Sequence, residues 1–302
     1  MSFNEYNTVE QMILDAVENL GRTSSVEPMY DNPPGASLGG EFKPSRWSYL
    51  PGLQVPRQPG DVMVEAWLRE ALLRLNPEIE AQPDRADEVI YALRAILLSV
   101  QADGLVRANE NFMAWLRGEK TMPFGQNGEH VSIRLVDAIH PANNRLTVVN
   151  QWTFLAGTVT KRFDVVFVVN GLPLVIGEAK TPTRSAVTWF DGAFQVNEIY
   201  ERRVPAMFVP NVFSFATDGR LYRFGSIRMP IEMWSPWRTR ENEPEGSLAD
   251  VRRSVESMLR PEVVRTSCKA SRYSPRTRSI AASRSSAVTS SISPRTSSST
   301  AW

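Results

Sequence analysis

Cysteine and histidine are scarce in this chain of 302 residues, which holds Cys268, His130 and His140 and no others of either type. A single cysteine cannot form an internal disulfide, so a disulfide-stapled scaffold is excluded. A structural zinc site needs about four Cys or His ligands, so a cysteine-based or histidine-rich metal centre is excluded as well.

Long apolar runs are also missing, because no run reaches the roughly eighteen residues that a membrane span needs. The first residues, MSFNEYNTVE, have neither a basic start nor an apolar core, so we do not expect a secretion signal. Eight Trp, thirteen Phe and a hydrophobic content of 42% fit a globular protein. We therefore expect a cytoplasmic protein with no membrane partner.

Acidic residues are absent from the C-terminal end. Residues 265–302 contain seven Lys or Arg, thirteen Ser, five Thr and no Asp or Glu, so we expect a disordered tail. The rest of the chain then carries 27 basic and 33 acidic residues, a net charge of −6. Proteins that hold DNA unaided usually have a basic face. If this chain acts on nucleic acid, another component should deliver it.

Helical periodicity predicts a first helix from Thr8 to about Leu20, with Glu10 in its first turn. Glu10 either complements the helix dipole there or belongs to a site. Residues 22–60 are dense in Pro and Gly and predict no regular element. A helical insert, residues 62–117, follows, with its first helix capped by Asp61 and with later helices at residues 85–100 and 106–116.

From Val131 the apolar period changes to two, which is typical of strands. The pattern predicts strands at residues 131–136, 146–155, 163–169, 174–180, 206–216 and 221–224. A helix at residues 186–203 should bury Phe190 and Phe194, and a last helix should cover residues 247–259. This order predicts an α/β fold, a mixed sheet flanked by helices.

The segment KRFDVVFVVNGLPLVIGEAK, residues 161–180, carries the strongest chemical signal. Asp164 lies in its first strand, and Glu178 and Lys180 end its second, on one face because side chains two residues apart in a strand point the same way. A lone Glu-x-Lys is weak, and Glu41 and Lys43 repeat it by chance. The two strands and the amphipathic helix after them distinguish this pair.

Carboxylate and carbonyl oxygens are the ligands that Mg²⁺ prefers, so Asp164, Glu178 and the carbonyl of Ala179 are the candidate metal ligands. Lys180 would hold the attacking water and face the developing negative charge. The alternative is a salt bridge at the end of a strand.

The turn between these strands sets a geometric condition. If Asn170 and Gly171 form a regular two-residue turn, Asp164 faces Gly177 and lies on the opposite face from Glu178. A single metal site therefore predicts a three- or five-residue connection, or a β-bulge, that places Asp164 opposite Ile176 or Glu178.

The runs RFDVVFVVNGLPLVIGEAKTP, WFDGAFQVNEIY and VPNVFSFATDG resemble the N-terminal nuclease domain of the R (restriction and translocation) subunit of type I restriction enzymes, within the PD-(D/E)xK superfamily. The resemblance implies a restriction-endonuclease-like fold over residues 1–240 and a linker helix at residues 241–264. It implies that Asp164, Glu178 and Lys180 are the motif residues, and that Glu10 supplies the acidic group of the first helix.

Gln195 and Tyr200 resemble the Gln-x-x-x-Tyr element that follows the nuclease core in this family. Four residues separate them here, one more than the usual pattern, so Tyr200 departs from it. Helix packing is the alternative role for both side chains.

The resemblance implies a Mg²⁺-dependent endonuclease that cuts double-stranded DNA together with modification and specificity subunits. Full-length relatives also carry an ATP-driven motor, but this chain contains no Gly-x-x-x-x-Gly-Lys-Ser/Thr loop and hence no ATP site of that kind. We expect the residues after Val264 to be read in a shifted frame, which gives a truncated product. The competing hypothesis is an inactive remnant that only binds DNA or partner subunits.

Overall fold

The computed structural model describes residues 8–20, 46–180, 187–240, 242–261, 263–264 and 267. Most of the predicted tail, residues 265–302, and the chance pair Glu41 and Lys43 lie outside them. Within the described residues the main elements are α1 (Thr8–Glu18), β1 (Ser48–Pro51), η2 (Gly52–Gln54), α2 (Glu65–Leu75), α3 (Pro77–Glu80), α4 (Arg85–Asp103), α5 (Leu105–Leu116), β2 (Thr121–Met122), β3 (Val131–Ser132), β4 (Leu146–Ala156), β5 (Val159–Val169), β6 (Leu172–Ala179), α6 (Trp189–Phe194), η4 (Gln195–Tyr200), α7 (Glu201–Arg203), η5 (Pro205–Phe208), β7 (Phe213–Thr217), β8 (Tyr222–Gly225) and α8 (Leu248–Met258).

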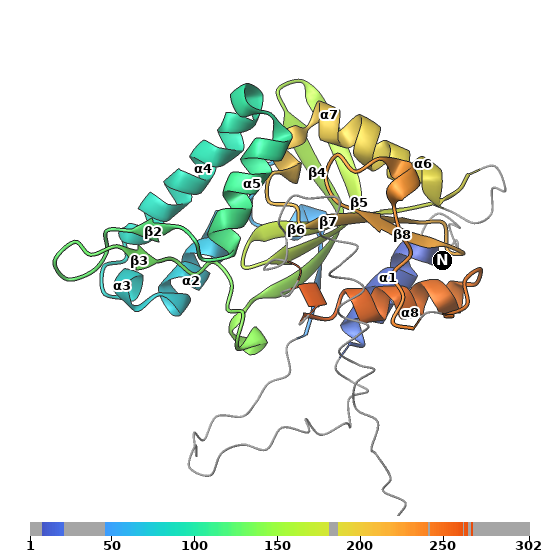
Figure 1. Cartoon of the computed structure of the whole chain (residues 1–302), viewed down its shortest axis with the longest axis horizontal. Coiled ribbons are helices and arrows are strands. Elements are labelled where there is room, and N and C mark those ends of the chain that lie inside the picture. Colours follow the sequence, from blue (N-terminus) through green and yellow to red (C-terminus); the bar gives the residue numbers. More distant parts are fainter. Residues whose placement is uncertain are drawn as a thin grey trace, which may run out of the picture.

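A six-stranded mixed sheet forms the centre of the molecule, in the order β1-β4-β5-β6-β7-β8. β1 pairs parallel with β4 and β6 pairs parallel with β7, while the other neighbours are antiparallel. In the view of Figure 1, α6 and α7 lie above the sheet, and α1 and α8 pack together below it. This confirms the predicted α/β class.

The sheet contains one strand that the sequence did not predict. β1 lies inside the Pro- and Gly-rich stretch that was expected to be irregular, so that expectation was wrong. β1 is an edge strand and bonds only to β4, and Pro51 ends it, a position where a missing N–H does no harm.

Two predicted strands are shorter than expected. β3 spans two residues and pairs with β2 in a separate ribbon, apart from the main sheet. The run at residues 206–216 begins as a 3₁₀ helix, η5, and becomes a strand only at Phe213. A short apolar run fits a buried helix as well as a buried strand, so its pattern could not separate the two.

The helical insert, α2 to α5, docks at the turn between β5 and β6 (Figure 1). Val64 N–H donates to the carbonyl of Gly171 at 2.8 Å, and the Asn109 amide donates to the carbonyls of Val209 and Asn211. Asp61 does not cap α2, which begins at Glu65; its carboxylate instead accepts from the N–H of Gln58.

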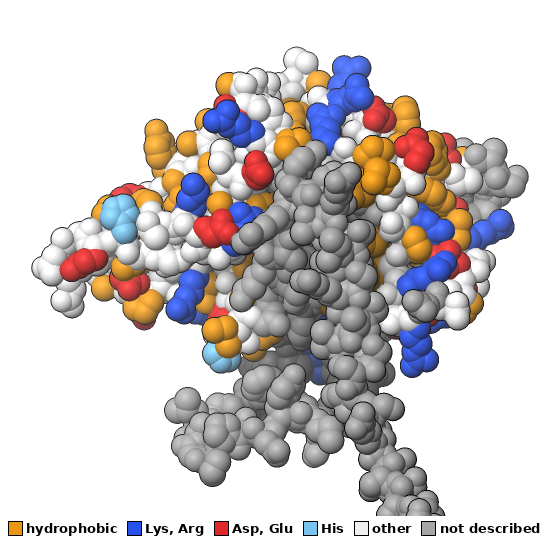
Figure 2. Space-filling model, viewed as in Figure 1, with side chains coloured by type: hydrophobic (Ala, Val, Ile, Leu, Met, Phe, Trp, Pro, Cys, Tyr) orange, Lys and Arg blue, Asp and Glu red, His pale blue; other side chains and the backbone are white. Residues whose placement is uncertain are grey.

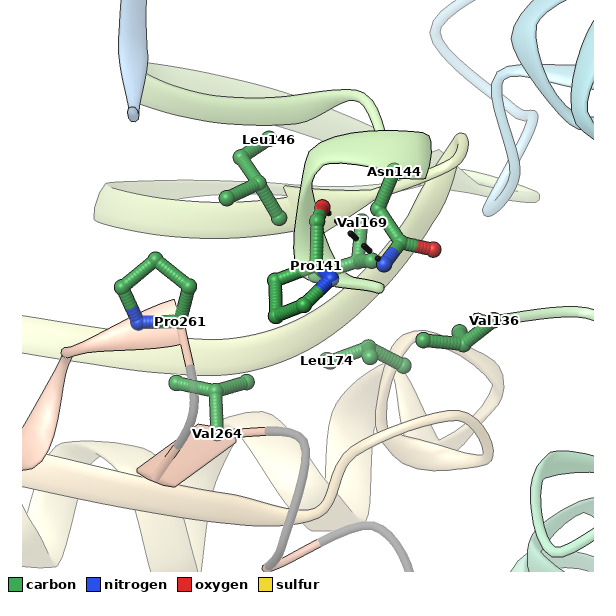
Figure 3. Close-up of a pocket in the computed structure, with 8 residues that line it drawn as sticks. All are labelled: Val136, Pro141, Asn144, Leu146, Val169, Leu174, Pro261 and Val264. Atoms are coloured by element: carbon green, nitrogen blue, oxygen red, sulfur yellow. Dashed lines mark hydrogen bonds between the residues drawn. The ribbon is translucent and has the colours of Figure 1, made fainter. Parts of the chain in front are cut away.

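A mostly apolar surface lies at the turn end of the sheet. A small hollow there is lined by Val136, Pro141, Asn144, Leu146, Val169, Leu174, Pro261 and Val264. Figure 3 shows Pro261 and Val264, from the chain after α8, facing Leu146 and Val169 of the sheet. Val169 lies five residues along β5 from Asp164, about 16 Å in an extended strand, so this hollow is remote from the candidate site. In the described part of the chain, no helix has the length and apolar character that a membrane crossing requires.

Candidate active site

The β5–β6 hairpin satisfies the geometric condition through a bulge. Asn170 and Gly171 form a two-residue turn with φ values of 51° and 85°, so the longer connections were not found. The register then shifts between Phe167 and Val168, because β6 has one extra residue there. Beyond the shift Val165 faces Gly177, and the same register, continued by one residue, sets Asp164 opposite Glu178. The bulge therefore places both carboxylates on one face, as one of the predicted alternatives required.

Asp164 and Glu178 meet beside the end of β6. The backbone N–H of Ala179 donates to Asp164 Oδ2 at 3.0 Å. Glu178 is 1% exposed, and its Oε1 accepts from Lys180 Nζ at 2.8 Å. Its other oxygen, Oε2, is buried without a hydrogen-bond partner. Glu201 Oε1 is also buried without a partner, so the unpaired oxygen alone does not mark a site; Glu178 differs because a second carboxylate, Asp164, lies beside it together with Lys180.

The helix after β6 closes over this cluster. A Cβ at Gly192 of α6 would lie only 3.5 Å from the Cγ atoms of both Glu178 and Lys180. Small residues on the inner face of α6 permit this approach, since Gly192 and Ala193 are buried. Phe190 and Phe194, which were predicted to be buried, are 43% and 47% exposed and turn outward instead.

The local electrostatics oppose full ionisation of the carboxylates. Burial raises the pKa of Glu178 to about 8, and the nearby charge of Asp164 raises it further while Lys180 lowers it. Burial also raises the pKa of Asp164, against the lowering effect of the Ala179 N–H and of Lys180. A cation that bound between these groups would relieve both effects.

Gln195 and Tyr200 are brought together by a π-helix. η4 has hydrogen bonds from residue i to i+5, so residues five apart lie one above the other, where an α-helix would align residues four apart. The Gln195 amide donates to the Tyr200 hydroxyl, which in turn donates to the carbonyl of Arg162 at 3.2 Å. The π-helix thus accommodates the extra residue between Gln195 and Tyr200.

Lys180 is the meeting point of these groups. Its Nζ donates to Gln195 Oε1 at 2.6 Å as well as to Glu178, and its side chain is 18% exposed. Its backbone N–H donates to the carbonyl of Thr217 on β7, which fixes the end of β6. The ammonium therefore lies between the carboxylate on β6 and the amide on η4.

Glu10 reaches the sheet from α1 and is 7% exposed. Gln151 Nε2 donates to its Oε2 at 2.8 Å. Burial raises the pKa of Glu10, hydrogen bonds from Asn150 and Gln151 lower it, and the charge of Asp164 raises it. Asp164 thus interacts electrostatically with both Glu10 and Glu178. Within the described residues, no three His, Cys, Asp or Glu side chains already form a group that could hold a metal ion.

Asn150 and Gln151 were not identified from the sequence. The signal was present, since two amides interrupt the apolar run of the strand LTVVNQWTFLA. They contact Glu10 of the first helix, a long-range pairing that no local pattern encodes.

The donor set fits a hard cation. Glu178 has a buried carboxylate oxygen without a partner, and Asp164, which accepts from the N–H of Ala179, offers further carboxylate oxygens beside it. Mg²⁺ is bound in proteins by one or two carboxylates and keeps several waters.

Comparison with known proteins places this geometry in a family context. Residues 2–230 match the family model described as type I restriction enzyme R protein N terminus. The type I restriction enzyme HindI endonuclease subunit of Haemophilus influenzae is 33% identical over 204 residues, which cover 64% of this chain and 19% of that subunit. The match thus spans about a fifth of the length of that relative.

Proposed function

Because this chain belongs to the family of type I restriction enzyme R protein N termini, we propose that it is a Mg²⁺-dependent endonuclease that hydrolyses DNA phosphodiester bonds. The observation that carries the proposal is the convergence of Asp164, Glu178 and Lys180 at the end of β6, where the charge of Asp164 raises the proton affinity of Glu178 beside the ammonium. Two neighbouring buried carboxylates are costly without a cation between them, and functional sites are where such costs are often retained. The residues follow the PD-(D/E)xK pattern.

Asp164, Glu178 and the carbonyl of Ala179 would hold the metal. A bound Mg²⁺ supplies a lowered pKa for a water ligand and positive charge against the phosphate. Glu178 is the ligand whose ionisation depends most on this charge, because burial and Asp164 raise its pKa to about 8.

Lys180 faces the negative charge that develops on the phosphate and orients the attacking water. The Oε1 of Gln195 fixes the ammonium by accepting one of its protons, and Tyr200 fixes Gln195 in turn. Burial raises the pKa of Tyr200, so its phenol stays neutral and serves as a hydrogen-bonding group. Gln195 and Tyr200 are therefore neutral groups that orient the Lys180 ammonium.

The substrate is double-stranded DNA that other components deliver. Without residues 265–302 the net charge is −6, and on the coloured parts of the face drawn in Figure 2 the Lys and Arg side chains are dispersed among acidic and hydrophobic ones. A domain with this net charge gains little non-specific affinity for phosphates. Modification and specificity subunits of a restriction complex would supply the target, as partners of this chain.

The test is cleavage of supercoiled plasmid by the purified chain in Mg²⁺, beside Glu178→Ala and Lys180→Ala variants. We expect nicked and linear products from the wild-type chain, a loss of at least about 100-fold in both variants, and no products in EDTA. Equal cleavage by all three proteins would show that a contaminant or another site is responsible.

The competing function, a remnant that binds without cutting, gives a different result. It predicts no cleavage by any of the three proteins and the same DNA or subunit binding in each. Measuring DNA binding by fluorescence anisotropy on the same preparations separates the two, because only the endonuclease couples Glu178 and Lys180 to product formation.

A further inference from the structure

Gln151 has an unusual backbone conformation in the middle of β4. Its φ is 53°, the left-handed region, although it is neither Gly nor one of the residues that tolerate this region well. The ladder between β4 and β5 pairs Asn150 with Val165 and Trp152 with Phe163, so Gln151 lies opposite Asp164 and interrupts the regular pairing there. The distortion is thus aligned with the candidate catalytic residue.

Residues of the segment that follows β1 accommodate this kink. A Cβ at Gly52 would lie 2.6 Å from the carbonyl oxygen of Gln151 and 2.7 Å from that of Asn150, so only glycine fits there. Arg57 donates to the carbonyl of Thr153 and stacks over the ring of Trp152 at 3.8 Å. Backbone strain that is fixed from several sides is typical of functional sites.

The kink directs the Gln151 amide to Glu10, whose Oε2 accepts from Nε2 at 2.8 Å. Asn150 supports the same carboxylate, and its own Oδ1 accepts from the Tyr49 hydroxyl at 3.0 Å. Glu10 is nearly buried and lies within electrostatic range of Asp164. The hydrogen bond from Gln151 therefore fixes the Glu10 carboxylate, which lies within electrostatic range of Asp164.

We propose that Gln151 is a positioning residue that holds the Glu10 carboxylate against the Asp164 side of the metal site. This proposal rests on the proposed function. Mg²⁺ keeps several of its waters when it binds to protein, and a fixed carboxylate at the rim is an acceptor for them. Residues that orient the ligands and waters of a metal typically change its affinity by 10- to 100-fold when removed.

The experiment is a Mg²⁺ titration of the full chain, followed by the thermal unfolding midpoint. Gln151→Gly retains the backbone freedom that the kink requires and removes only the amide, so it isolates the side chain. We expect half-maximal stabilisation at about 10-fold more Mg²⁺ than for the wild-type chain. Gln151→Asn, which tolerates the left-handed region and keeps an amide, should recover part of that loss.

A double variant identifies the route of the effect. If Gln151 acts through Glu10, then Glu10→Gln with Gln151→Gly should titrate like Glu10→Gln alone. Additive losses would overturn the positioning role, and so would a Gln151→Gly titration equal to that of the wild-type chain. Glu178→Gln serves as the reference for the metal site. If Mg²⁺ raises the thermal unfolding midpoint of neither this variant nor the wild-type chain, or raises both equally, the proposed metal site is wrong.

Discussion

The two ends of the β5–β6 hairpin both bury polar side chains, but they differ in whether those side chains find hydrogen-bond partners. At the turn end Asn170 is fully buried, and its amide donates to the carbonyl of Leu135 and to Asn144 Oδ1, each at 2.9 Å. Its Oδ1 accepts from the N–H of Arg145 at 2.8 Å. At the other end Glu178 is equally buried, but one of its two carboxylate oxygens has no partner.

This difference marks a functional group only together with its neighbours, since Glu201 Oε1 is also unpaired but Glu178 alone of the two lies beside a second carboxylate, Asp164, and Lys180. Native proteins pair nearly all of their buried polar atoms, so Asn170 is the ordinary case. Glu178 combines an unpaired oxygen with a strongly raised pKa, which makes the folded chain less stable than it could be. The turn end stabilises the hairpin, whereas the other end retains an arrangement that stability does not favour.

The largest expected effect comes from neutralising Glu178. Its pKa is about 8 in the folded chain against an ordinary 4.5, so the folded state binds its proton more tightly. In EDTA, the stability that this group contributes is fully present below pH 4.5 and is lost as pH rises to about 8. We expect Glu178→Gln to exceed the wild-type free energy of unfolding by about 4 kcal/mol at pH 8 and to match it near pH 4.5, measured by urea denaturation.

Glu201 provides the matched control for this prediction, because burial raises its pKa to about 8 as well and it bonds to the N–H of Arg228, away from the site. Glu201→Gln should flatten the pH profile similarly. At pH 8 Mg²⁺ should stabilise the wild-type chain and Glu201→Gln, but not Glu178→Gln. Destabilisation by Glu178→Gln at pH 8 would mean that the charge is compensated and that the two ends of the hairpin do not differ.

A smaller effect of opposite sign is expected at the turn end. Asn170→Gly keeps the positive φ but removes three side-chain hydrogen bonds and leaves buried backbone groups unpaired. We expect the free energy of unfolding to fall by about 3 kcal/mol, and the thermal midpoint by about 6–12 °C. Plasmid cleavage at a temperature where the variant stays folded should be unchanged.

Asn127 lies in an exposed turn and serves as the reference substitution. Asn127→Gly should change the free energy of unfolding by no more than about 0.5 kcal/mol. A similarly small change in Asn170→Gly would show that the turn end does not depend on its paired amide.

The features that local pattern encodes were predictable from the sequence. The hairpin, its three charged residues and the amphipathic helices follow from periodicity and from residue type. The need for a bulge followed from parity, since two carboxylates on one face are incompatible with a regular two-residue turn. The position of the bulge, beside Leu174, depends on how β6 packs between β5 and β7, and no local signal specifies it.

Features that depend on distant contacts were not predictable. β1 could not be predicted, because its four residues lie among prolines and glycines and form a strand only by pairing with the edge of β4. Phe190 and Phe194 were assigned to the wrong face, because the close approach of Gly192 to Glu178 decides which side of α6 is buried. The amides of Asn150 and Gln151 can be recognised as part of the site only when the fold places Glu10 of α1 beside them.

The smallest expected effect tests the π-helix, which lets Tyr200 support Gln195 despite their unusual spacing. Tyr200→Phe removes the hydroxyl that bonds to Gln195 and to the carbonyl of Arg162, so we expect a loss of about 1 kcal/mol in the free energy of unfolding. Gln195 can then turn away from Lys180, and plasmid cleavage should fall by several-fold while the Mg²⁺ midpoint stays unchanged. Tyr222→Phe is the matched control, since that hydroxyl is also buried but bonds only to the sulfur of Met258 at 3.3 Å, a weak acceptor. If both variants cleave as the wild-type chain does, η4 has only a packing role and the functional residues at this end of the hairpin are Asp164, Glu178 and Lys180. If only Tyr200→Phe is impaired, the functional residues include Gln195 and Tyr200 of η4 as well.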